Sequence, residues 1–315
     1  MARVLVTRAL PPGGLDPLVD AGHEIAARAD DTPFTHDELV AAAGEVDAIV
    51  SLLTDRIDDD VLAAGAAGSL RVVANVAVGY DNIDVDAARR VGVAVCNTPG
   101  VLDETTADLA FLLLLAASRL ASDAERDLRA GAWAGWGINQ YLGQDVAGTV
   151  LGLVGFGRIG RAVAFRAGGF GMEVLHHARH DSGRPGYVAD LDKLLRRADA
   201  VSLHVPLTAA TRHLIGRREL ELMKPTAVLV NTARGPVVDE IALAEALESG
   251  SIFAAGLDVF EHEPDVHPRL LAAPRTVLLP HIGSASTATR TRMARVAAGG
   301  ACAVLAGEHP PNLVT

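Results

Sequence analysis

An apolar strand pattern that runs directly into a glycine-rich turn constrains the fold of this chain more than any other feature. Residues 150–154 are Val-Leu-Gly-Leu-Val, and the turn at residues 155–160 reads Gly-Phe-Gly-Arg-Ile-Gly. In such a unit Gly155 permits a tight turn, Gly157 lets the backbone approach a pyrophosphate, and Gly160 lets the following helix pack close to the strand. Because the start of that helix offers unpaired N–H groups to phosphates, the turn predicts a dinucleotide-binding site.

Apolar runs continue to alternate with helical patterns after this turn. Six runs read as strands, which is the number in a complete dinucleotide fold of two mononucleotide halves. They are residues 150–154, 173–176, 200–204, 227–231, 254–257 and 276–279. This alternation is typical of a parallel sheet that helices cover on both faces.

A shorter series of the same kind precedes the turn. Its predicted strands are residues 4–7, 48–52, 72–74 and 94–96, and its predicted helices are residues 37–43 and 58–64. The chain then breaks at Asn97-Thr98-Pro99-Gly100, and a long helical pattern follows from about residue 102 to 130.

A last helical pattern, from about residue 286 to 306, accompanies no strand of the second series, so we expect it to cross back to the first domain. The predicted fold is α/β, with two Rossmann-like domains on doubly wound parallel sheets and a cleft between them. Residues 1–98 with 287–315 would form a discontinuous substrate-binding (catalytic) domain, and residues 99–286 the dinucleotide-binding domain. The length of 315 residues fits two domains.

Composition narrows the range of partners. The formal net charge is −11 and the arginine pairs are short and lie beside acids, which argues against a nucleic-acid partner. The most apolar segment, residues 109–117, is far shorter than the roughly 20 residues that span a bilayer. The N-terminus reads as a strand, not as a signal peptide. Cys96 and Cys302 form no CxxC pair, and no His/Cys cluster has zinc spacing. We therefore expect a cytoplasmic protein with no metal site and no membrane partner.

The residues after the second strand of the dinucleotide series bear on the choice between NADP and NAD. An NAD enzyme usually has an acidic residue about 20 residues beyond the glycines, where it binds the ribose 2′-OH. Here Ala178 takes that place, and Arg179, His180 and Arg184 follow. Because the guanidinium of Arg179 suits a 2′-phosphate, the sequence predicts a preference for NADP. The alternative is a solvated loop that binds either cofactor.

Four side chains late in the chain carry the expected chemistry. Arg234, Asp258, Glu263 and His281 each follow a predicted strand, and ligands of such sheets bind outside the carboxyl ends of the strands. We therefore expect the four to converge. Arg234 offers a fixed fork to an anionic substrate, His281 can exchange a proton near neutral pH, and an adjacent Glu263 would favour the imidazolium. These roles fit hydride transfer to or from a small 2-keto or 2-hydroxy acid.

The order of several motifs resembles a known family. The chain looks like the D-isomer-specific 2-hydroxyacid dehydrogenases, and most closely like their glyoxylate/hydroxypyruvate reductase branch. The segments that carry the resemblance are residues 75–84, 97–102, 105–108, 155–160, 203–208, 230–235, 256–264 and 279–284. The resemblance is strong from about residue 72 to 286, and weak before about 45 and after about 290.

This resemblance implies a role for each matching residue. Arg234 would hold the substrate, His281 would be the acid in reduction and the base in oxidation, and Glu263 would pair with His281. Backbone N–H groups of Val78 and Gly79 would hold the substrate carboxylate, as oriented amides can. The residues implied to line the cofactor are Thr106, Gly155, Phe156, Gly157, Arg158, Ile159, Gly160, Arg179, Pro206, Thr232, Asp258 and Gly283.

The departures from the family pattern narrow the range of cofactors and reactions that the resemblance implies. His176-His177-Ala178 stands where NAD-preferring members have an acid. In this respect the sequence resembles the NADP-preferring members. Formate dehydrogenases have glutamine in place of Glu263, so that activity is disfavoured. Two alternatives stay open: a dehydrogenase for another acid, such as a bulkier 2-keto acid or phosphite, and a nucleotide-sensing binding protein of the same fold.

The segment 132–141 contains two Trp and one Tyr in a chain with few aromatic residues. Such side chains need burial, and the neighbouring region contributes to a dimer in the family. We therefore expect a homodimer with this loop near the active site of the partner. The alternative is a loop that packs on its own chain.

Overall fold

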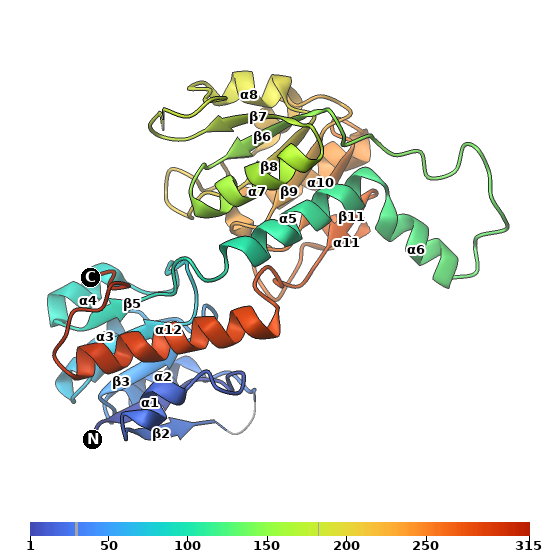
Figure 1. Cartoon of the computed structure of the whole chain (residues 1–315). Helices are drawn as coiled ribbons and strands as arrows, with labels where there is room; N and C mark the ends of the chain where they lie inside the picture. The colour runs from blue at the N-terminus through green and yellow to red at the C-terminus, as the bar shows by residue number, and fades with distance from the viewer. Residues whose placement is uncertain (29–30, 182) are drawn as a thin grey trace. The chain divides into compact units, whose positions relative to one another are not determined.

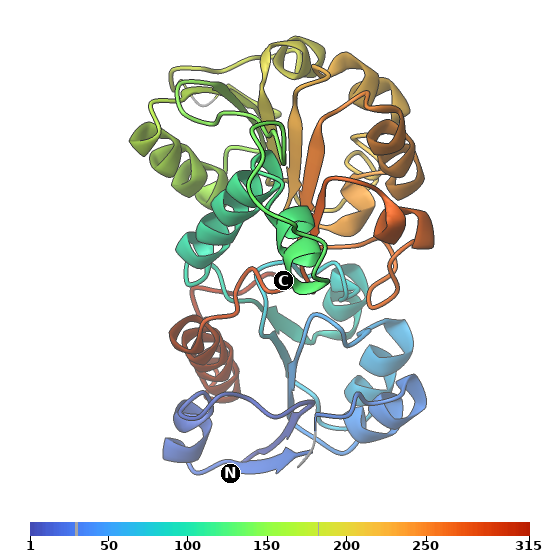
Figure 2. The same cartoon turned by 90° about the vertical axis from the view of Figure 1, so that its right-hand side faces the viewer.

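The computed structural model describes residues 1–28, 31–181 and 183–315. The chain folds into two compact units, which we call unit 1 (residues 1–102 with 284–315) and unit 2 (residues 103–283). Each unit contains one parallel sheet, and in each of them helices lie on both faces of the sheet (Figure 1; Figure 2). The prediction of an α/β fold with two parallel sheets is confirmed.

The sheet of unit 1 has five parallel strands in the order β2-β1-β3-β4-β5. The strands are β1 (Arg3–Val6), β2 (Glu24–Ala27), β3 (Ala48–Ser51), β4 (Val72–Asn75) and β5 (Ala94–Cys96). The helices are α1 (Asp16–Asp20), α2 (His36–Ala43), α3 (Asp59–Ala67), α4 (Val85–Val91) and α12 (Thr287–Leu305). Helix α12 packs on β3, β4 and β5. Alternate strand residues such as Ile49 and Val73 form a core with α2, α3 and α4.

The sheet of unit 2 has six parallel strands in the order β11-β10-β9-β8-β6-β7. The strands are β6 (Val150–Val154), β7 (Glu173–His177), β8 (Ala200–Leu203), β9 (Val228–Asn231), β10 (Ala254–Leu257) and β11 (Thr276–Leu278). The helices are α5 (Asp103–Ser118), α6 (Ala121–Arg129), α7 (Arg158–Gly169), α8 (Leu191–Arg197), α9 (Arg217–Leu222), the short 3₁₀ helix η1 (Gly235–Val237), α10 (Glu240–Ser249) and α11 (Pro268–Ala272). Helices α5 and α7 pack on one face, and α8 to α11 contribute to the core on the other.

Short polar side chains start many of these helices. The hydroxyl of Thr35 accepts the N–H of Glu38 while the Glu38 carboxylate accepts the N–H of Thr35, which is a capping box. Asp58, Asp239 and Ser286 cap α3, α10 and α12 in the simpler way, through one side-chain oxygen. Each cap satisfies an N–H group that a helix start leaves without a partner.

The long helix predicted over residues 102–130 is wrong, because the structure has two helices there. Leu120 lies between them in the left-handed conformation (φ 53°), and α5 and α6 make an angle of 68°. Among the described residues no single helix is long and apolar enough to cross a membrane, although this bent pair together meets the length and composition for one. Strand β2 was also not predicted, because it is a half-exposed edge strand without a strong apolar run.

Candidate active site

The predicted site residues of unit 2 lie mostly at one edge of its sheet. Because the strands are parallel, the residues that follow them meet at the carboxyl edge. Thr106 lies in the first turns of α5 and its Oγ1 donates to the carbonyl of Gly283 at 3.4 Å. The residues that follow strands are Gly155 to Gly160 after β6, Arg179 after β7, Pro206 after β8, Thr232 and Arg234 after β9, Asp258 and Glu263 after β10, and His281 and Gly283 after β11.

His281 and Glu263 form a hydrogen-bonded pair. Nδ1 of His281 lies 2.7 Å from Oε2 of Glu263, and the backbone N–H of Phe260 donates to Oε1 of the same carboxylate at 3.0 Å. A carboxylate accepts, so Nδ1 carries the hydrogen. Nε2 has no hydrogen-bond partner in the described part of the chain, and the side chain remains 25% exposed. The pair therefore holds the imidazole ring with Nε2 available to a ligand.

The Glu263 carboxyl is held in its ionised form. Partial burial acts to raise its pKa, but the hydrogen bond and charge of His281, the N–H of Phe260 and the charge of Arg234 outweigh it, so the pKa of Glu263 is lowered. Arg234 is half-buried and its Nη1 donates to the carbonyl of Ala233 at 2.8 Å. The cation, the acid and the imidazole thus act on one another in unit 2.

Asp258 holds the segment that carries His281. Its buried carboxylate accepts the N–H groups of Ile282 at 2.7 Å and Gly283 at 2.8 Å, and its carbonyl accepts the N–H of His281 at 2.9 Å. Burial raises the pKa of Asp258, against the effect of the two N–H groups. His281 has φ 53°, a left-handed conformation that costs a residue with a side chain about 1 kcal/mol. The contacts of Asp258 hold that conformation in place. Asp258 was expected at the site, but these contacts were not predicted from the sequence.

The glycine turn fits a dinucleotide. A Cβ on Gly160 would lie 2.3 Å from the carbonyl oxygen of Gly155, and a Cβ on Gly155 would lie 2.4 Å from that of His204. At Gly157 a Cβ would meet no atom within 4 Å, so this glycine faces open space at the start of α7. The buried Oγ1 of Thr232 has no hydrogen-bond partner among the described residues. The turn therefore leaves room for a pyrophosphate, and Thr232 leaves a polar atom for a ligand.

The end of β7 presents cations but no carboxylate at the position of the ribose-binding acid. Arg179 is exposed and forms no ion pair or hydrogen bond with the rest of the described chain. The buried ring of His176 stacks on Phe156, with centroids 3.8 Å apart and an angle of 18°. Burial lowers the pKa of His176. Arg158 is the first residue of α7, and its Nε lies 3.4 Å from Oδ2 of Asp103.

Val78 and Gly79 belong to unit 1, where they follow β4 at the carboxyl edge of that sheet. Both residues are half-buried. Neither of their N–H groups donates to an acceptor in residues 1–28, 31–181 or 183–315. Two adjacent amides without an acceptor among the described residues can bind an anion.

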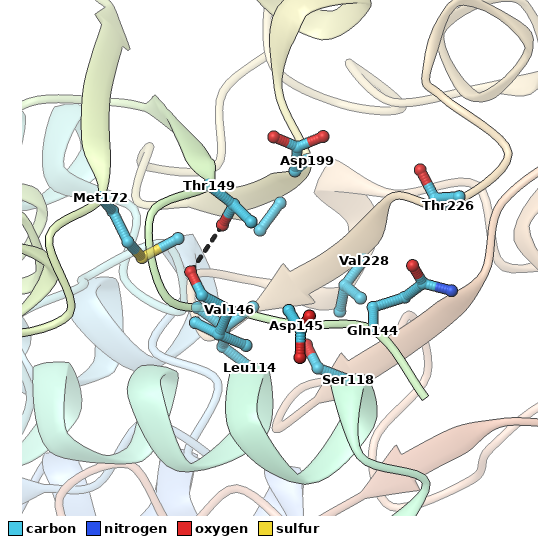
Figure 3. A pocket seen from close by; sticks show the side chains of 11 residues that line it. Leu114, Ser118, Gln144, Asp145, Val146, Thr149, Met172, Asp199, Thr226 and Val228 are labelled. Atoms are coloured by element: carbon cyan, nitrogen blue, oxygen red, sulfur yellow. Dashed lines mark hydrogen bonds between the residues drawn. The ribbon is translucent and has the colours of Figure 1, made fainter. Parts of the chain in front are cut away.

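A cavity of about 180 Å³ in unit 2 is lined by residues other than the predicted site residues (Figure 3). It is lined at the starts of strands by Thr149, Asp199 and Thr226, which places it at the opposite edge of the sheet. The Asp199 carboxylate is satisfied by Lys224 at 2.7 Å and by the N–H of Val150 at 2.9 Å. The second carboxylate in the lining, that of Asp145, is exposed to solvent.

One cluster in unit 1 has ligand-type atoms within 4.8 Å of one another, namely those of His36, Asp58 and Asp60. Arg56 already pairs with the Asp58 carboxylate at 3.0 Å, and His36 does so at the same distance. These contacts account for the charge of Asp58 without a metal ion.

Comparisons with known proteins identify the family to which this chain belongs. Residues 111–283 match the family described as D-isomer specific 2-hydroxyacid dehydrogenase, NAD binding domain. The glyoxylate reductase of Korarchaeum cryptofilum is 50% identical over 99% of this chain and 95% of its own length. The chain belongs to the D-isomer-specific 2-hydroxyacid dehydrogenase family, as predicted.

Solved structures agree with this assignment. The TT0316 protein of Thermus thermophilus superposes with a TM-score of 0.92 at 46% identity, covering 99% of this chain and all of that one. An NADPH-dependent glyoxylate/hydroxypyruvate reductase from Sinorhizobium meliloti, solved in complex with NADP and malonate, has a TM-score of 0.86 at 34% identity and covers 99% and 96% of the two chains. The chain is thus an NAD(P)-dependent 2-hydroxyacid dehydrogenase.

Proposed function

We propose that this protein reduces a small 2-keto acid of the glyoxylate or hydroxypyruvate type to the 2-hydroxy acid, with NADPH as its preferred reductant. The observation that carries the proposal is the 2.7 Å contact between His281 and Glu263, which leaves Nε2 of the imidazole available. The names of the relatives support the substrate class, since two of those compared above are glyoxylate or glyoxylate/hydroxypyruvate reductases.

Each residue has one task in the proposed reaction. The bound nicotinamide nucleotide supplies the hydride for C2 of the keto acid. His281, as imidazolium, donates the Nε2 proton to the carbonyl oxygen, and Glu263 stabilises that charged ring through Nδ1. Arg234 binds the carbonyl and carboxylate oxygens through its guanidinium fork. The N–H groups of Val78 and Gly79 bind the carboxylate, so unit 1 is the substrate-binding unit.

The proposed cofactor contacts follow the carboxyl edge of unit 2. The glycine turn and the start of α7, with Phe156, Arg158 and Ile159, would hold the pyrophosphate. Thr106, Pro206, Thr232, Asp258 and Gly283 would line the remainder of the nucleotide. The exposed Arg179 would pair with the 2′-phosphate of NADP, since Ala178 stands where NAD-preferring members have an acid.

Two variants test the assignment of the catalytic residues. His281→Ala removes the proton donor, so we expect turnover to be lost while the Kd for NADPH is retained. Arg234→Ala removes the fork, so we expect both substrate binding and turnover to be lost. Turnover near the normal rate in His281→Ala would reject the assignment. Nucleotide binding without turnover in the unmodified protein would instead favour a nucleotide-sensing binding protein.

We also propose a homodimer. Helix α6 has no buried residue, and Trp133, Trp136 and Ile138 are 50%, 80% and 71% exposed. This segment extends away from the remainder of unit 2 (Figure 1). Large apolar side chains on such an extension need a partner surface, and we place residues 132–141 near the active site of the second copy. A monomeric mass in light scattering at micromolar concentration would contradict the dimer.

A further inference from the structure

Two consecutive carbonyl groups after β4 are held by the segment that follows β5. The backbone N–H of Thr98 donates to the carbonyl of Ala77 at 2.9 Å. The side-chain amide of Asn97 donates through Nδ2 to the carbonyl of Val78 at 2.8 Å. Thr98 is fully buried, so this segment is a fixed support for the loop that it contacts.

These two bonds determine where the amides of Val78 and Gly79 point. In a planar trans peptide the C=O and N–H groups point in opposite directions. The carbonyl of Ala77 shares its peptide plane with the N–H of Val78, and the carbonyl of Val78 shares its plane with the N–H of Gly79. Fixing both carbonyls on the side of residues 97–98 therefore turns both N–H groups to the other side. There they meet no acceptor from the described residues.

Asn97 is in turn held by the C-terminal segment. Nδ2 of Asn312 donates to the carbonyl of Asn97 at 2.7 Å, and the N–H of Asn97 donates to the carbonyl of Asn312 at 3.2 Å. Asn312 is only 7% exposed and packs against Gly300 of α12, where a Cβ would lie 2.9 Å from its Nδ2. The N–H of Val314 donates to the carbonyl of Val95 at 2.7 Å, which ties the same segment to β5.

We infer that Asn97 is the positioning residue for the amides that bind the substrate carboxylate, and that Asn312 fixes Asn97 from the C-terminal segment. The inference rests on the proposed function of Val78 and Gly79. The C-terminal segment then contributes to substrate binding indirectly, because both asparagines act through the amides of Val78 and Gly79 and not by contact with the substrate. Without the Asn97 donor, the Val78–Gly79 peptide can rotate and its N–H no longer faces the carboxylate.

Asn97→Asp is the most direct variant, because it keeps the size of the side chain but replaces the donor with a charged acceptor that repels the carbonyl of Val78. Losing one aligned hydrogen bond to a carboxylate corresponds to about tenfold in affinity. We expect KM for glyoxylate, and the inhibition constant of the unreactive carboxylate oxalate, to rise about tenfold or more. We expect kcat at saturating glyoxylate to fall less than about threefold, and the Kd for NADPH to stay unchanged. Asn312→Ala should raise the same two constants by a smaller factor.

The matched control is Thr315→Val. It removes the hydroxyl that accepts the N–H of Val95 at 3.2 Å in the same segment, but it leaves Asn312 and Asn97 in place. We expect it to keep the normal KM. If the Asn97 variant fails to fold, Asn312→Ala carries the test, because it leaves the Asn97 amide in the chain. Unchanged KM and oxalate inhibition in the folded variants would overturn the inference. An unmodified protein without glyoxylate turnover would instead overturn the proposed function.

Discussion

Oε2 of Glu263 lies 2.7 Å from Nδ1 of His281, and this contact leaves Nε2 as the ring nitrogen without a hydrogen-bond partner among the described residues. The carboxylate itself is held through its other oxygen by the N–H of Phe260 at 3.0 Å. These two hydrogen bonds thus hold the imidazole ring of His281 in one orientation at the carboxyl edge of the sheet. The same contact places a negative charge beside the imidazole, because the pKa of Glu263 is lowered.

Glu263→Gln tests the charge separately from the contact, since a glutamine oxygen can still accept from Nδ1. The neutral amide lacks the negative charge that stabilises the imidazolium of His281 as it donates its proton. We expect kcat for glyoxylate reduction to fall about 10- to 100-fold, while the Kd for NADPH stays unchanged. Glu221→Gln on the exposed face of α9 is the control. A normal kcat in Glu263→Gln would show that the charge is not what matters.

The glycine turn gives a pair of variants, of which one should leave the stability of the fold unchanged and the other should lower it. Gly157→Ala places its methyl group in open space, so the melting temperature should stay within about 2 °C, while the Kd for NADPH rises at least about tenfold. Gly160→Ala drives a methyl group against the carbonyl of Gly155, and we expect it to cost about 1–3 kcal/mol of the free energy of unfolding. Thermal unfolding and nucleotide titration measure both. Normal NADPH affinity in Gly157→Ala would place the pyrophosphate elsewhere.

Asp258→Asn tests the segment that carries His281. The asparagine keeps one acceptor oxygen but turns an NH₂ group toward an N–H of Ile282 or Gly283, so one buried donor loses its partner. We expect the free energy of unfolding to fall by about 1–3 kcal/mol and kcat to fall about tenfold or more. Urea unfolding and initial rates give the two numbers. A variant with full stability and full activity would show that these bonds do not position the histidine.

His204 predicts a pH dependence of stability. Burial lowers its pKa to about 4 in the folded protein, against roughly 6.5 in an unfolded chain. As the pH falls the unfolded state takes up this proton first, so the contribution of the neutral ring is present above pH 6.5 and is lost as the pH falls toward 4. The loss amounts to about 3 kcal/mol at pH 4.

His204→Gln removes this titration while it retains a side chain that can bond to the hydroxyl of Ser202, which lies 2.9 Å from Nε2 of His204. Urea unfolding at pH 7, 6, 5 and 4 should show the unmodified protein losing stability relative to the variant over that range. His309→Gln, at an exposed position, should follow the unmodified protein. Parallel curves for His204→Gln and the unmodified protein would refute the prediction.

Much of the fold could be predicted because its strands are buried on both faces. Residues such as Val150–Val154 and Ala254–Leu257 read as unbroken apolar runs, and the structure has strands with these same bounds. The strand β2 has no such run, because it lies at the edge of the sheet and is only half-buried. The break between α5 and α6 was hidden because residues 121–129 have a helical pattern of their own, while the turn depends on the left-handed backbone of Leu120.

The site could be predicted only in part for a related reason. Arg234, Glu263 and His281 are chemical groups placed after strands, and parallel topology brings such residues to one edge. The hydrogen bonds of Asp258 and Asn97 could not be predicted in the same way, because they depend on the direction of single peptide groups. The Asn312–Asn97 contact joins residues 215 positions apart, and no periodicity in the sequence encodes such a contact.

Initial rates with NADPH and NADH, each with glyoxylate, hydroxypyruvate and pyruvate, test the central claim most directly. The absorbance of the reduced nicotinamide at saturating cofactor gives kcat and KM for every pair. We predict fast oxidation of NADPH with glyoxylate or hydroxypyruvate, a lower kcat/KM with NADH, and loss of that difference in Arg179→Ala. Equal kcat/KM for the two cofactors would contradict the preference for NADP. Tight nucleotide binding without turnover of any of the three acids would contradict the proposed reductase.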